Sequence, residues 1–262
     1  MQQEAYKWDS TLYDDKHSFV YRYGADLVDM LGPKKGEKVL DLGCGSGALT
    51  EALRTRSGSV VGVDSSSEMI KKARNTYPLC TFLKGDARNF SGSHPFDCIF
   101  SNATLHWVIE PEKAVKCMFE NLRYGGRVAL EFGGKNNVDT VIQALRRILF
   151  SKGYKEQSAL QLWYFPSIST YTSLLERNGF EVTLAEWYDR PTELADGETG
   201  ILDWLSMFAK PFFKGIAAEE ASVIKKEVQG SVSGALFKNS KWYADYKRIR
   251  VLARKIENNN LK

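Results

Sequence analysis

The chain has 262 residues, 43% of them hydrophobic and 26% charged, and its 36 basic and 32 acidic side chains give a net charge of +4. The apolar fraction is too high and the charge too small for a disordered chain. The signs alternate along most of the sequence, unlike the dense basic face of a dedicated nucleic-acid binder. At roughly 150 residues per domain, the length allows one or two domains with a sizeable core.

The sequence also argues against membrane-spanning, secreted and metal-binding classes. It has no run of about 18 apolar residues, and its polar start, MQQEAYKWDS, is unlike a signal peptide. Four widely spaced cysteines without a CxxC pair predict neither a disulfide framework nor a zinc site. We therefore expect a cytoplasmic protein with no metal and no membrane contact.

The first half of the chain alternates short apolar runs with segments of helical spacing. Such alternation predicts a parallel sheet covered by helices on both faces, with ligands at the carboxyl ends of its strands. The expected strands are Lys38–Leu42, Ser59–Val63, Cys80–Leu83, Phe96–Ser101 and Arg127–Phe132. The expected helices are Ala48–Arg56, Ser67–Thr76 and Glu112–Leu122.

In the second half the pattern is looser. It predicts helices over Val138–Lys152, Thr170–Asn178 and Gly200–Gly230, and strands over Glu181–Glu186 and Arg248–Arg254. We expect one α/β domain over residues 1–262: a Rossmann-like, seven-stranded, mostly parallel sheet with helices on both faces. Its expected parts are a cofactor-binding core (36–132), an N-terminal helical lid (1–35) and a helical cap inserted among the late strands (138–178 and 190–230).

The most informative segment is a glycine-rich turn, DLGCGSG, at residues 41–47. Glycines at alternate positions omit side chains where a ligand must approach the main chain closely. The helix expected after the turn begins with unpaired N–H groups that suit a polar ligand. Asp64, at the end of the second expected strand, can accept two hydrogen bonds from the hydroxyls of a ribose. The turn therefore predicts a nucleoside-containing cofactor.

Two cofactors compete for this turn. Gly43, Gly45 and Ala48 satisfy the loose GxGxxG/A pattern of dinucleotide-binding proteins. However, a carboxylate at Asp41, just before the turn, poorly serves an anionic pyrophosphate, whereas it attracts the ammonium and sulfonium groups of S-adenosylmethionine. Asp86, after the third expected strand, can accept a hydrogen bond from an adenine amino group. The spacing therefore favours S-adenosylmethionine over a nicotinamide dinucleotide.

Five motifs occur in a characteristic order between Val39 and Phe132: DLGCGSG, GVDSS, GDA, FDCIFSN and GGRVAL. This series resembles that of the class I S-adenosylmethionine-dependent methyltransferases. The resemblance implies that the chain is an enzyme that uses this cofactor. Besides Asp41, which is expected at the cofactor from its charge, the resemblance implies binding roles for eleven residues. These are Gly43, Cys44, Gly45 and Gly47 at the methionine part, Asp64, Ser65 and Met69 at the ribose and adenosine, Asp86 and Ala87 at the adenine, and Asn102 and Ala103 against the methionine.

Other segments are similar to the trans-aconitate methyltransferase group, and Thr104–Trp107 is also like juvenile-hormone-acid methyltransferases. The first similarity is carried by Trp8 with Tyr13, by Arg22, and by Asn102 followed by His106 and Trp107. Both groups methylate carboxylates of small molecules. The resemblance therefore implies a small-molecule acceptor, with a monomer as the default state.

The chemistry of the acceptor leaves the roles of three candidate catalytic residues open. A carboxylate is ionised at neutral pH and needs only donors that position it, such as Arg22 and Trp107. A hydroxyl or nitrogen acceptor needs a base. His106 suits either reading, as a donor that orients a carboxylate or as a base.

RNA or protein is a further alternative acceptor, because seven basic residues stand against two acidic ones from Lys241 onward. No NPPY-like tetrad of base-methylating enzymes follows the fourth expected strand, where Ser101–Thr104 reads SNAT. Nucleic acid is therefore a disfavoured partner.

Overall fold

The structure is a computed structural model that describes the backbone of residues 19–195 and 197–257, with side chains from residue 24 onward. The chain divides into two compact units. The first, which we call the sheet unit, comprises the residues up to Gly134, Trp163–Trp187 and those from Ile249 on. The second, the helical unit, comprises Lys135–Leu162 and Tyr188–Arg248.

The strands form one eight-stranded sheet in the order β3-β2-β1-β4-β5-β8-β6, with β7 paired antiparallel to β8. Neighbouring strands from β3 to β5 pair in parallel. The strands are β1 (Lys38–Leu42), β2 (Ser59–Asp64), β3 (Thr81–Lys84), β4 (Phe96–Asn102), β5 (Leu122–Gly133), β6 (Phe180–Glu193), β7 (Phe237–Lys238) and β8 (Lys241–Lys255). The expected Rossmann-like α/β fold is confirmed, and the strand beyond the expected seven is the two-residue β7.

The helices follow the expected alternation in the first half of the chain. Those of the sheet unit are α2 (Phe19–Leu31), α3 (Ala48–Ser57), α4 (Ser67–Thr76), the 3₁₀ turn η1 (Leu105–Trp107), α5 (Pro111–Asn121) and α8 (Ile168–Arg177). Those of the helical unit are α6 (Asp139–Ser151), α7 (Lys155–Ser158), α9 (Gly200–Phe208), the 3₁₀ turn η2 (Lys210–Phe213) and α10 (Ala218–Leu236). None of the described helices is long and apolar enough to cross a membrane.

Three expected elements differ most from those observed, and β5 also begins at Leu122 rather than at Arg127. The expected helix Gly200–Gly230 is instead α9, η2 and α10, because Pro211 cannot continue the helical hydrogen bonding and Gly215 has a φ of 81°. Strand β6 extends well beyond Glu186 and contains Pro191. Strand β8 begins at Lys241 rather than at Arg248. The lengths of both strands were underestimated, because polar residues alternate with apolar ones along them.

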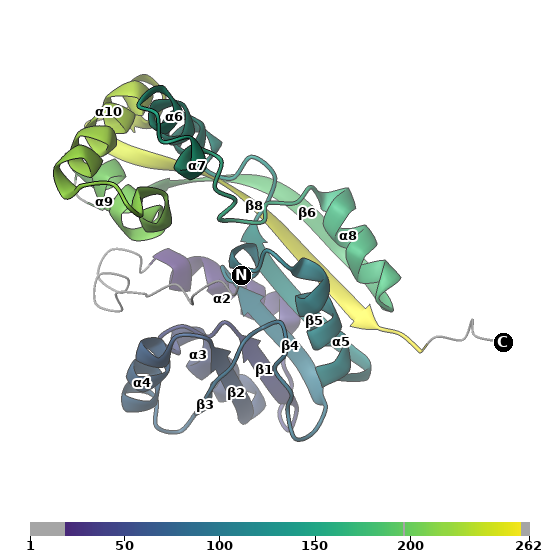
Figure 1. Ribbon diagram of the computed structural model, residues 1–262. Coiled ribbons are helices and arrows are strands. Elements are labelled where there is room, and N and C mark those ends of the chain that lie inside the picture. Colours follow the sequence, from purple (N-terminus) through teal and green to yellow (C-terminus); the bar gives the residue numbers. More distant parts are fainter. Residues whose placement is uncertain (1–18, 196, 258–262) are drawn as a thin grey trace. The chain divides into compact units, whose positions relative to one another are not determined.

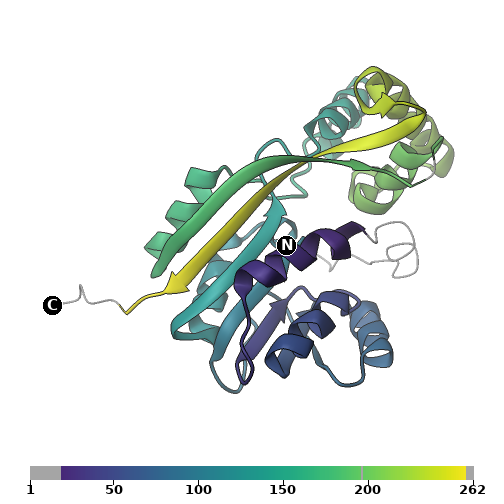
Figure 2. The same cartoon turned by 180° about the vertical axis from the view of Figure 1, so that it is seen from behind.

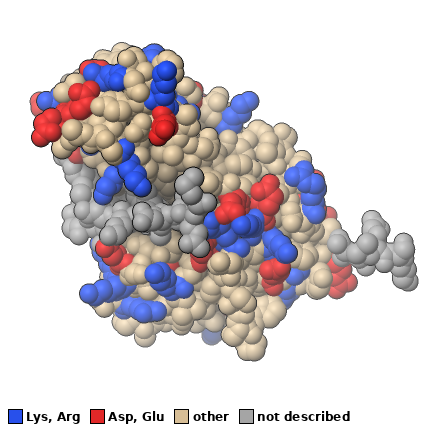
Figure 3. Space-filling model, viewed as in Figure 1, with Lys and Arg blue, Asp and Glu red and all other residues tan. Residues whose placement is uncertain are grey.

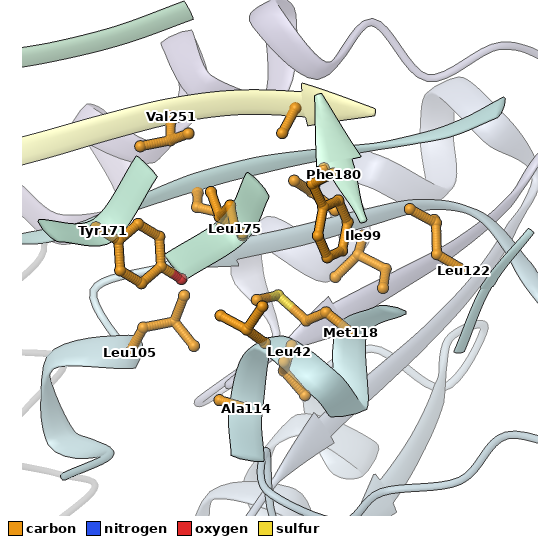
Figure 4. Packing of buried hydrophobic residues seen from close by; sticks show 14 of the residues in the cluster. Leu42, Ile99, Leu105, Ala114, Met118, Leu122, Tyr171, Leu175, Phe180 and Val251 are labelled. Carbon is orange, nitrogen blue, oxygen red and sulfur yellow. The ribbon is translucent and has the colours of Figure 1, made fainter. Parts of the chain in front are cut away.

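The sheet unit buries apolar side chains on both faces of the sheet. Leu27 of α2 and Leu53 of α3 pack with Val39 and Phe100 on one face. Helices α5 and α8 cover the other face, where Met118 and Tyr171 belong to the larger cluster drawn in Figure 4. Figures 1 and 2 show α2 and α3 on the side opposite α5. Because both faces are covered, the central strands are nearly continuous apolar runs.

The helical unit has its own buried residues, including Val141 and Leu145 of α6 and Ile224 and Val228 of α10. Lys152 at the end of α6 pairs with Glu220 and Glu227 of α10. The segment 163–178, expected in the cap, belongs to the sheet unit, where α8 packs into the core. Two insertions, Lys135–Leu162 and Tyr188–Arg248, thus make up the helical unit.

Candidate functional site

The glycine-rich turn connects β1 to α3 and is fixed to the neighbouring strand β2. The backbone N–H groups of Gly43 and Cys44 both donate to the carbonyl of Val63, at 2.7 and 3.0 Å. Gly43, Gly45 and Gly47 have φ values of 85°, 53° and 93°, in the region that favours glycine. The turn therefore has a defined shape that follows from its three glycines.

These glycines serve different purposes. A Cβ on Gly43 would lie 2.1 Å from Oγ1 of Thr104, and one on Gly47 would lie 2.7 Å from the ring of Phe82. Those two positions exclude a side chain because the protein itself fills the space. Around Gly45, no described atom lies within 4 Å of the Cβ position. Only Gly45 thus fits the sequence-based argument that a side chain is omitted for a ligand.

Asp64, at the end of β2, is hydrogen-bonded to the backbone of the glycine-rich turn. Its Oδ2 accepts a hydrogen bond from the N–H of Gly45 at 3.0 Å, and its Oδ1 accepts one from the N–H of Ser66 at 2.8 Å. Burial raises its carboxyl pKa, while the N–H groups of Ser66, Gly45 and Ser65 oppose that shift. A carboxylate has about four lone-pair sites, so it retains capacity to accept from a ligand hydroxyl.

Asp41, the last acidic residue before the turn, is fully buried. Its Oδ2 accepts a hydrogen bond from Oγ1 of Thr50 at 2.6 Å. Burial raises its pKa to about 7, the bond from Thr50 opposes the rise, and the charge of Asp64 adds to it. Two carboxylates that repel each other make this turn favourable for a cationic group.

The residues expected at the adenine follow β3. Asp86 forms a bidentate ion pair with Arg88, whose Nη2 lies 2.5 Å from Oδ2, and this bond lowers the pKa of the Asp86 carboxyl. Arg88 also contacts Glu110 at 2.6 Å, immediately before α5. Ala87 is partly exposed, and Met69 of α4 is buried. Arg88 therefore fixes the position of the Asp86 carboxylate and uses much of its capacity to accept hydrogen bonds.

Asn102 and Ala103 lie at the end of β4, as expected. Ala103 has a φ of 55°, which is strained for a residue with a side chain, and its N–H donates to the carbonyl of Glu131 at 2.7 Å. The amide of Asn102 lies close to α2, since a Cβ on Gly24 would be 3.1 Å from its Nδ2. Strained backbone of this kind is common at ligand sites.

His106 lies in η1, just beyond β4, and only 8% of its surface is exposed. Its Nδ1 accepts a hydrogen bond from the N–H of Gly133 at 3.4 Å. An imidazole nitrogen that accepts carries no proton, so in the neutral ring the proton lies on Nε2. In this tautomer Nε2 is a donor rather than a base.

Aromatic rings surround this histidine. The centroids of Trp107 and Phe165 lie 5.5 and 5.9 Å from that of His106, and Trp163 stacks on Phe165. The N–H of Tyr164 also donates to the carbonyl of His106 at 2.9 Å. The segment Trp163–Phe165, which the sequence placed in the cap, therefore positions His106 and Trp107 within the sheet unit.

Some sequence-based candidates have no described side chain or no reactive character. Trp8 and Tyr13 lie outside the described residues, as does the side chain of Arg22. Cys44 is buried and its thiol pKa is raised, chiefly by burial, so it is a poor nucleophile. Among the described residues, no group of three or more His, Cys, Asp or Glu side chains could hold a metal ion.

Several of the basic residues near the C-terminus have partners within the chain. Lys241 pairs with Glu193, Lys247 with Asp189, and Arg250 with Glu131. On the face drawn in Figure 3, the Lys and Arg side chains of the described residues are interspersed with Asp and Glu. The local excess of positive charge therefore includes several cations already paired with carboxylates.

Three residues that matter to the site were missed by sequence reasoning: Thr50, Arg88 and Thr104. Their partners lie 9, 2 and 61 residues away, respectively. The Arg88 contact could have been found, because Asp86 and Arg88 are close in the chain. The contact of Thr104 with Gly43 depends on the parallel pairing of β1 and β4, which no local pattern indicates.

Comparisons with known proteins agree with this geometry. A family model described as a methyltransferase domain matches residues 39–126. The uncharacterized methyltransferase C70.08c of Schizosaccharomyces pombe is 33% identical, over 95% of this chain and 98% of its own. A trans-aconitate 2-methyltransferase of an Enterobacter species is 28% identical, over 81% and 83%. The crystal structure of the YcgJ protein of Bacillus subtilis, 16% identical, has a TM-score of 0.63 over 92% and 100% of the two chains.

Proposed function

Because the chain belongs to the class I S-adenosylmethionine-dependent methyltransferases, we propose that it methylates a carboxylate oxygen of a small organic acid. The relative named trans-aconitate 2-methyltransferase supports this acceptor class. The observation that carries the proposal is the hydrogen bond from the N–H of Gly133 to Nδ1 of His106, which assigns the proton to Nε2.

The turn after β1 suits the cofactor. Gly45 leaves space for a ligand beside the main chain, and the paired carboxylates of Asp41 and Asp64 favour a cationic group. In the proposed arrangement Gly43, Cys44, Gly45, Gly47, Asn102 and Ala103 lie along the methionine part, Asp64, Ser65 and Met69 hold the ribose and adenosine, and Asp86 and Ala87 contact the adenine. Since Arg88 binds the Asp86 carboxylate, the backbone of this segment is the better adenine contact.

When bound, the cofactor supplies an electrophilic methyl carbon, and a C–O bond to the acceptor forms as the C–S electron pair leaves with sulfur. A carboxylate is already ionised at neutral pH, so no base is needed. The chain's task is to position the acceptor. We propose that Nε2–H of His106 and the indole N–H of Trp107 donate to the acceptor, with Arg22 as a further cationic contact.

The proposal is tested by incubating the protein with cofactor that carries a labelled methyl group and with a panel of small acids, phenols and amines. Carboxyl methylation gives a base-labile ester, and we expect label of this kind with one or more of the acids. Base-stable label on a phenol or amine would replace this proposal with the alternative in which His106 is a base. Label incorporated into RNA or protein, with none in any small acid, would also overturn it.

Substitution of His106 separates the donor role from the base role. A glutamine can donate from its amide but cannot take a proton, so His106→Gln should retain more activity than His106→Ala. The rate of the wild type is measured at saturating cofactor, so that titration of Asp41 near pH 7 does not limit binding. With an ionised acceptor it should then stay nearly constant between pH 6.5 and 9, about two units or more above a carboxyl pKa. A rate that rises with pH and is abolished equally in both variants would contradict the donor role. Binding of S-adenosylhomocysteine should be unchanged in both variants and serves as the control.

A further inference from the structure

The loop after β3 contains an ion pair whose two partners are only two positions apart in the chain. Nε of Arg88 donates to Oδ1 of Asp86 at 2.9 Å, and Nη2 donates to Oδ2 at 2.5 Å. The backbone N–H of Arg88 also donates to Oδ1, at 2.9 Å. Arg88 therefore supplies three N–H donors to the carboxylate that is proposed to lie beside the adenine.

A second carboxylate holds the same guanidinium from its other end. Nη1 of Arg88 donates to Oε2 of Glu110 at 2.6 Å, and Glu110 in turn pairs with Lys113 on the first turn of α5. The bonds to Asp86 and Glu110 both raise the pKa of Arg88. All four side chains belong to the sheet unit. Contacts within one unit thus fix the guanidinium on two sides.

These bonds use most of the accepting capacity of Asp86. An ionised carboxylate has about four lone-pair sites. The backbone N–H and Nε–H of Arg88 fill both sites on Oδ1, and Nη2–H fills one on Oδ2. About one site remains, on an oxygen whose charge is shared with a guanidinium. A hydrogen bond donated to that oxygen is weaker than one donated to an unpaired charge.

We propose that Arg88 determines how strongly the protein distinguishes the base of its cofactor, because it pairs with the carboxylate that could otherwise accept from the adenine amino group. Arg88 is thus a positioning residue that acts through Asp86. The inference rests on the proposed placement of the adenine beside Asp86 and Ala87. It implies that the protein accepts cofactors altered at position 6 of the purine, including one with hydrogen in place of the amino group.

A specificity role and a purely structural role of Arg88 have different consequences. If Arg88 only attached the loop to α5, its loss would weaken the binding of every cofactor analogue by the same factor. If it controls the carboxylate, its loss changes the ratio of two affinities. That ratio, rather than either affinity, is the quantity to measure.

The test uses the full chain and two ligands, S-adenosylhomocysteine and its 6-deamino analogue, whose affinities are measured by calorimetry. The analogue lacks the amino group but keeps the neighbouring ring nitrogen as an acceptor, so contacts from backbone N–H groups are preserved. Arg88→Met releases the Asp86 carboxylate, and Asp86→Asn removes its charge. Lys113→Met is the matched control, because it takes a cation from Glu110 and leaves the pair of Arg88 and Asp86 intact.

The variants are expected to fold. The side chains of Arg88 and Asp86 are 32% and 33% exposed, so water can solvate the released carboxylate. Thermal unfolding of each variant checks this point.

In the wild type we expect the two ligands to bind with affinities within about 5-fold of each other, as for a weak hydrogen bond. Arg88→Met should raise the ratio about 10-fold, because the amino group then donates to an unpaired carboxylate. Asp86→Asn and Lys113→Met should keep the ratio of the wild type.

A wild-type ratio of about 30-fold or more that falls in Asp86→Asn would overturn the inference, since the paired carboxylate would then already recognise the amino group. An unchanged ratio in Arg88→Met, with both affinities reduced alike, would also overturn it and leave Arg88 a structural role. If the adenine lies elsewhere, neither affinity changes in any variant. Failure of the proposed acceptor class has a separate signature, because no acid is methylated while these affinities stay as expected.

Discussion

At the scale of single residues, the cofactor turn is governed by two carboxylates in different environments. Asp64 is held by two backbone N–H groups, whereas Asp41 is buried with one hydroxyl donor. This difference gives the two residues separate tests, one of ligand binding and one of pH-dependent stability.

Replacement of Asp64 by alanine should weaken S-adenosylhomocysteine binding about 100-fold or more, because two charge-assisted hydrogen bonds to the ribose are lost at about 1.5–3 kcal/mol each. Calorimetry measures this affinity. Glu68→Ala, on the exposed first turn of α4, is the control and should bind normally. Unchanged affinity in the Asp64 variant would show that the ribose assignment is incorrect.

The contribution of Asp41 to the free energy of unfolding depends on pH. Its pKa is raised from 3.8 to about 7 in the folded chain, so between these values the folded state binds more protons than the unfolded state. Stability from this group is therefore highest at low pH and falls as the pH rises from about 4 to 7. Asp41→Asn removes this loss, so urea unfolding should show a larger gain of the variant over the wild type at pH 8 than at pH 5. An equal difference at the two pH values would contradict the raised pKa.

At the scale of elements, the glycines of the turn between β1 and α3 have two different roles. Gly43 is required for folding, and Gly45 is expected to be required for ligand binding. Gly45→Ala introduces no clash with a described atom and costs about 1–2 kcal/mol for its left-handed backbone, yet it should abolish most cofactor affinity. Gly58→Ala, at the end of α3, also has a positive φ and open space. It should show the same loss of stability with normal binding. Similar cofactor affinities in the two variants would contradict the inference that the cofactor occupies the open space beside Gly45.

Gly43→Ala should behave differently, because its Cβ would overlap Thr104. We expect it to lose several times more stability than Gly45→Ala in urea unfolding, since both backbone strain and overpacking act there. If the two variants unfolded at the same urea concentration, Thr104 would not be the reason for this glycine.

At the scale of the whole molecule, the chain leaves the sheet unit after β5, returns to it over Trp163–Trp187, and leaves it again before it returns within β8. Arg250 of β8 pairs with the fully buried Glu131 of β5 at 2.6 Å and with Glu186 of β6 at 3.2 Å. One side chain thus connects three strands that are distant in sequence. These ion pairs therefore hold together the three late segments of the sheet unit.

Arg250→Ala should therefore destabilise the protein by about 3–5 kcal/mol, because it leaves the Glu131 carboxylate buried without its cation. The double variant Glu131→Leu with Arg250→Met should recover much of that loss. Lys116→Ala breaks the exposed pair with Glu120 and should change stability by less than about 1 kcal/mol. Chemical unfolding measures all three, and a small effect of Arg250→Ala alone would contradict this account.

The amino-acid sequence by itself determined the parallel half of the sheet, the position of the cofactor turn and the family. These features depend on local patterns: apolar runs, helical spacing and glycines near one another in the chain. Prediction was poorer for β6 and β8, where polar residues alternate and Pro191 interrupts the pattern.

Only the tertiary structure decided which side chains meet. It showed that a side chain at Gly43 would overlap Thr104, that Arg88 binds Asp86, that the Gly133 N–H sets the tautomer of His106, and that Trp204 donates to the Tyr246 hydroxyl. Most of these contacts join residues far apart in sequence. Their formation depends on strand register and packing, which a local pattern does not specify.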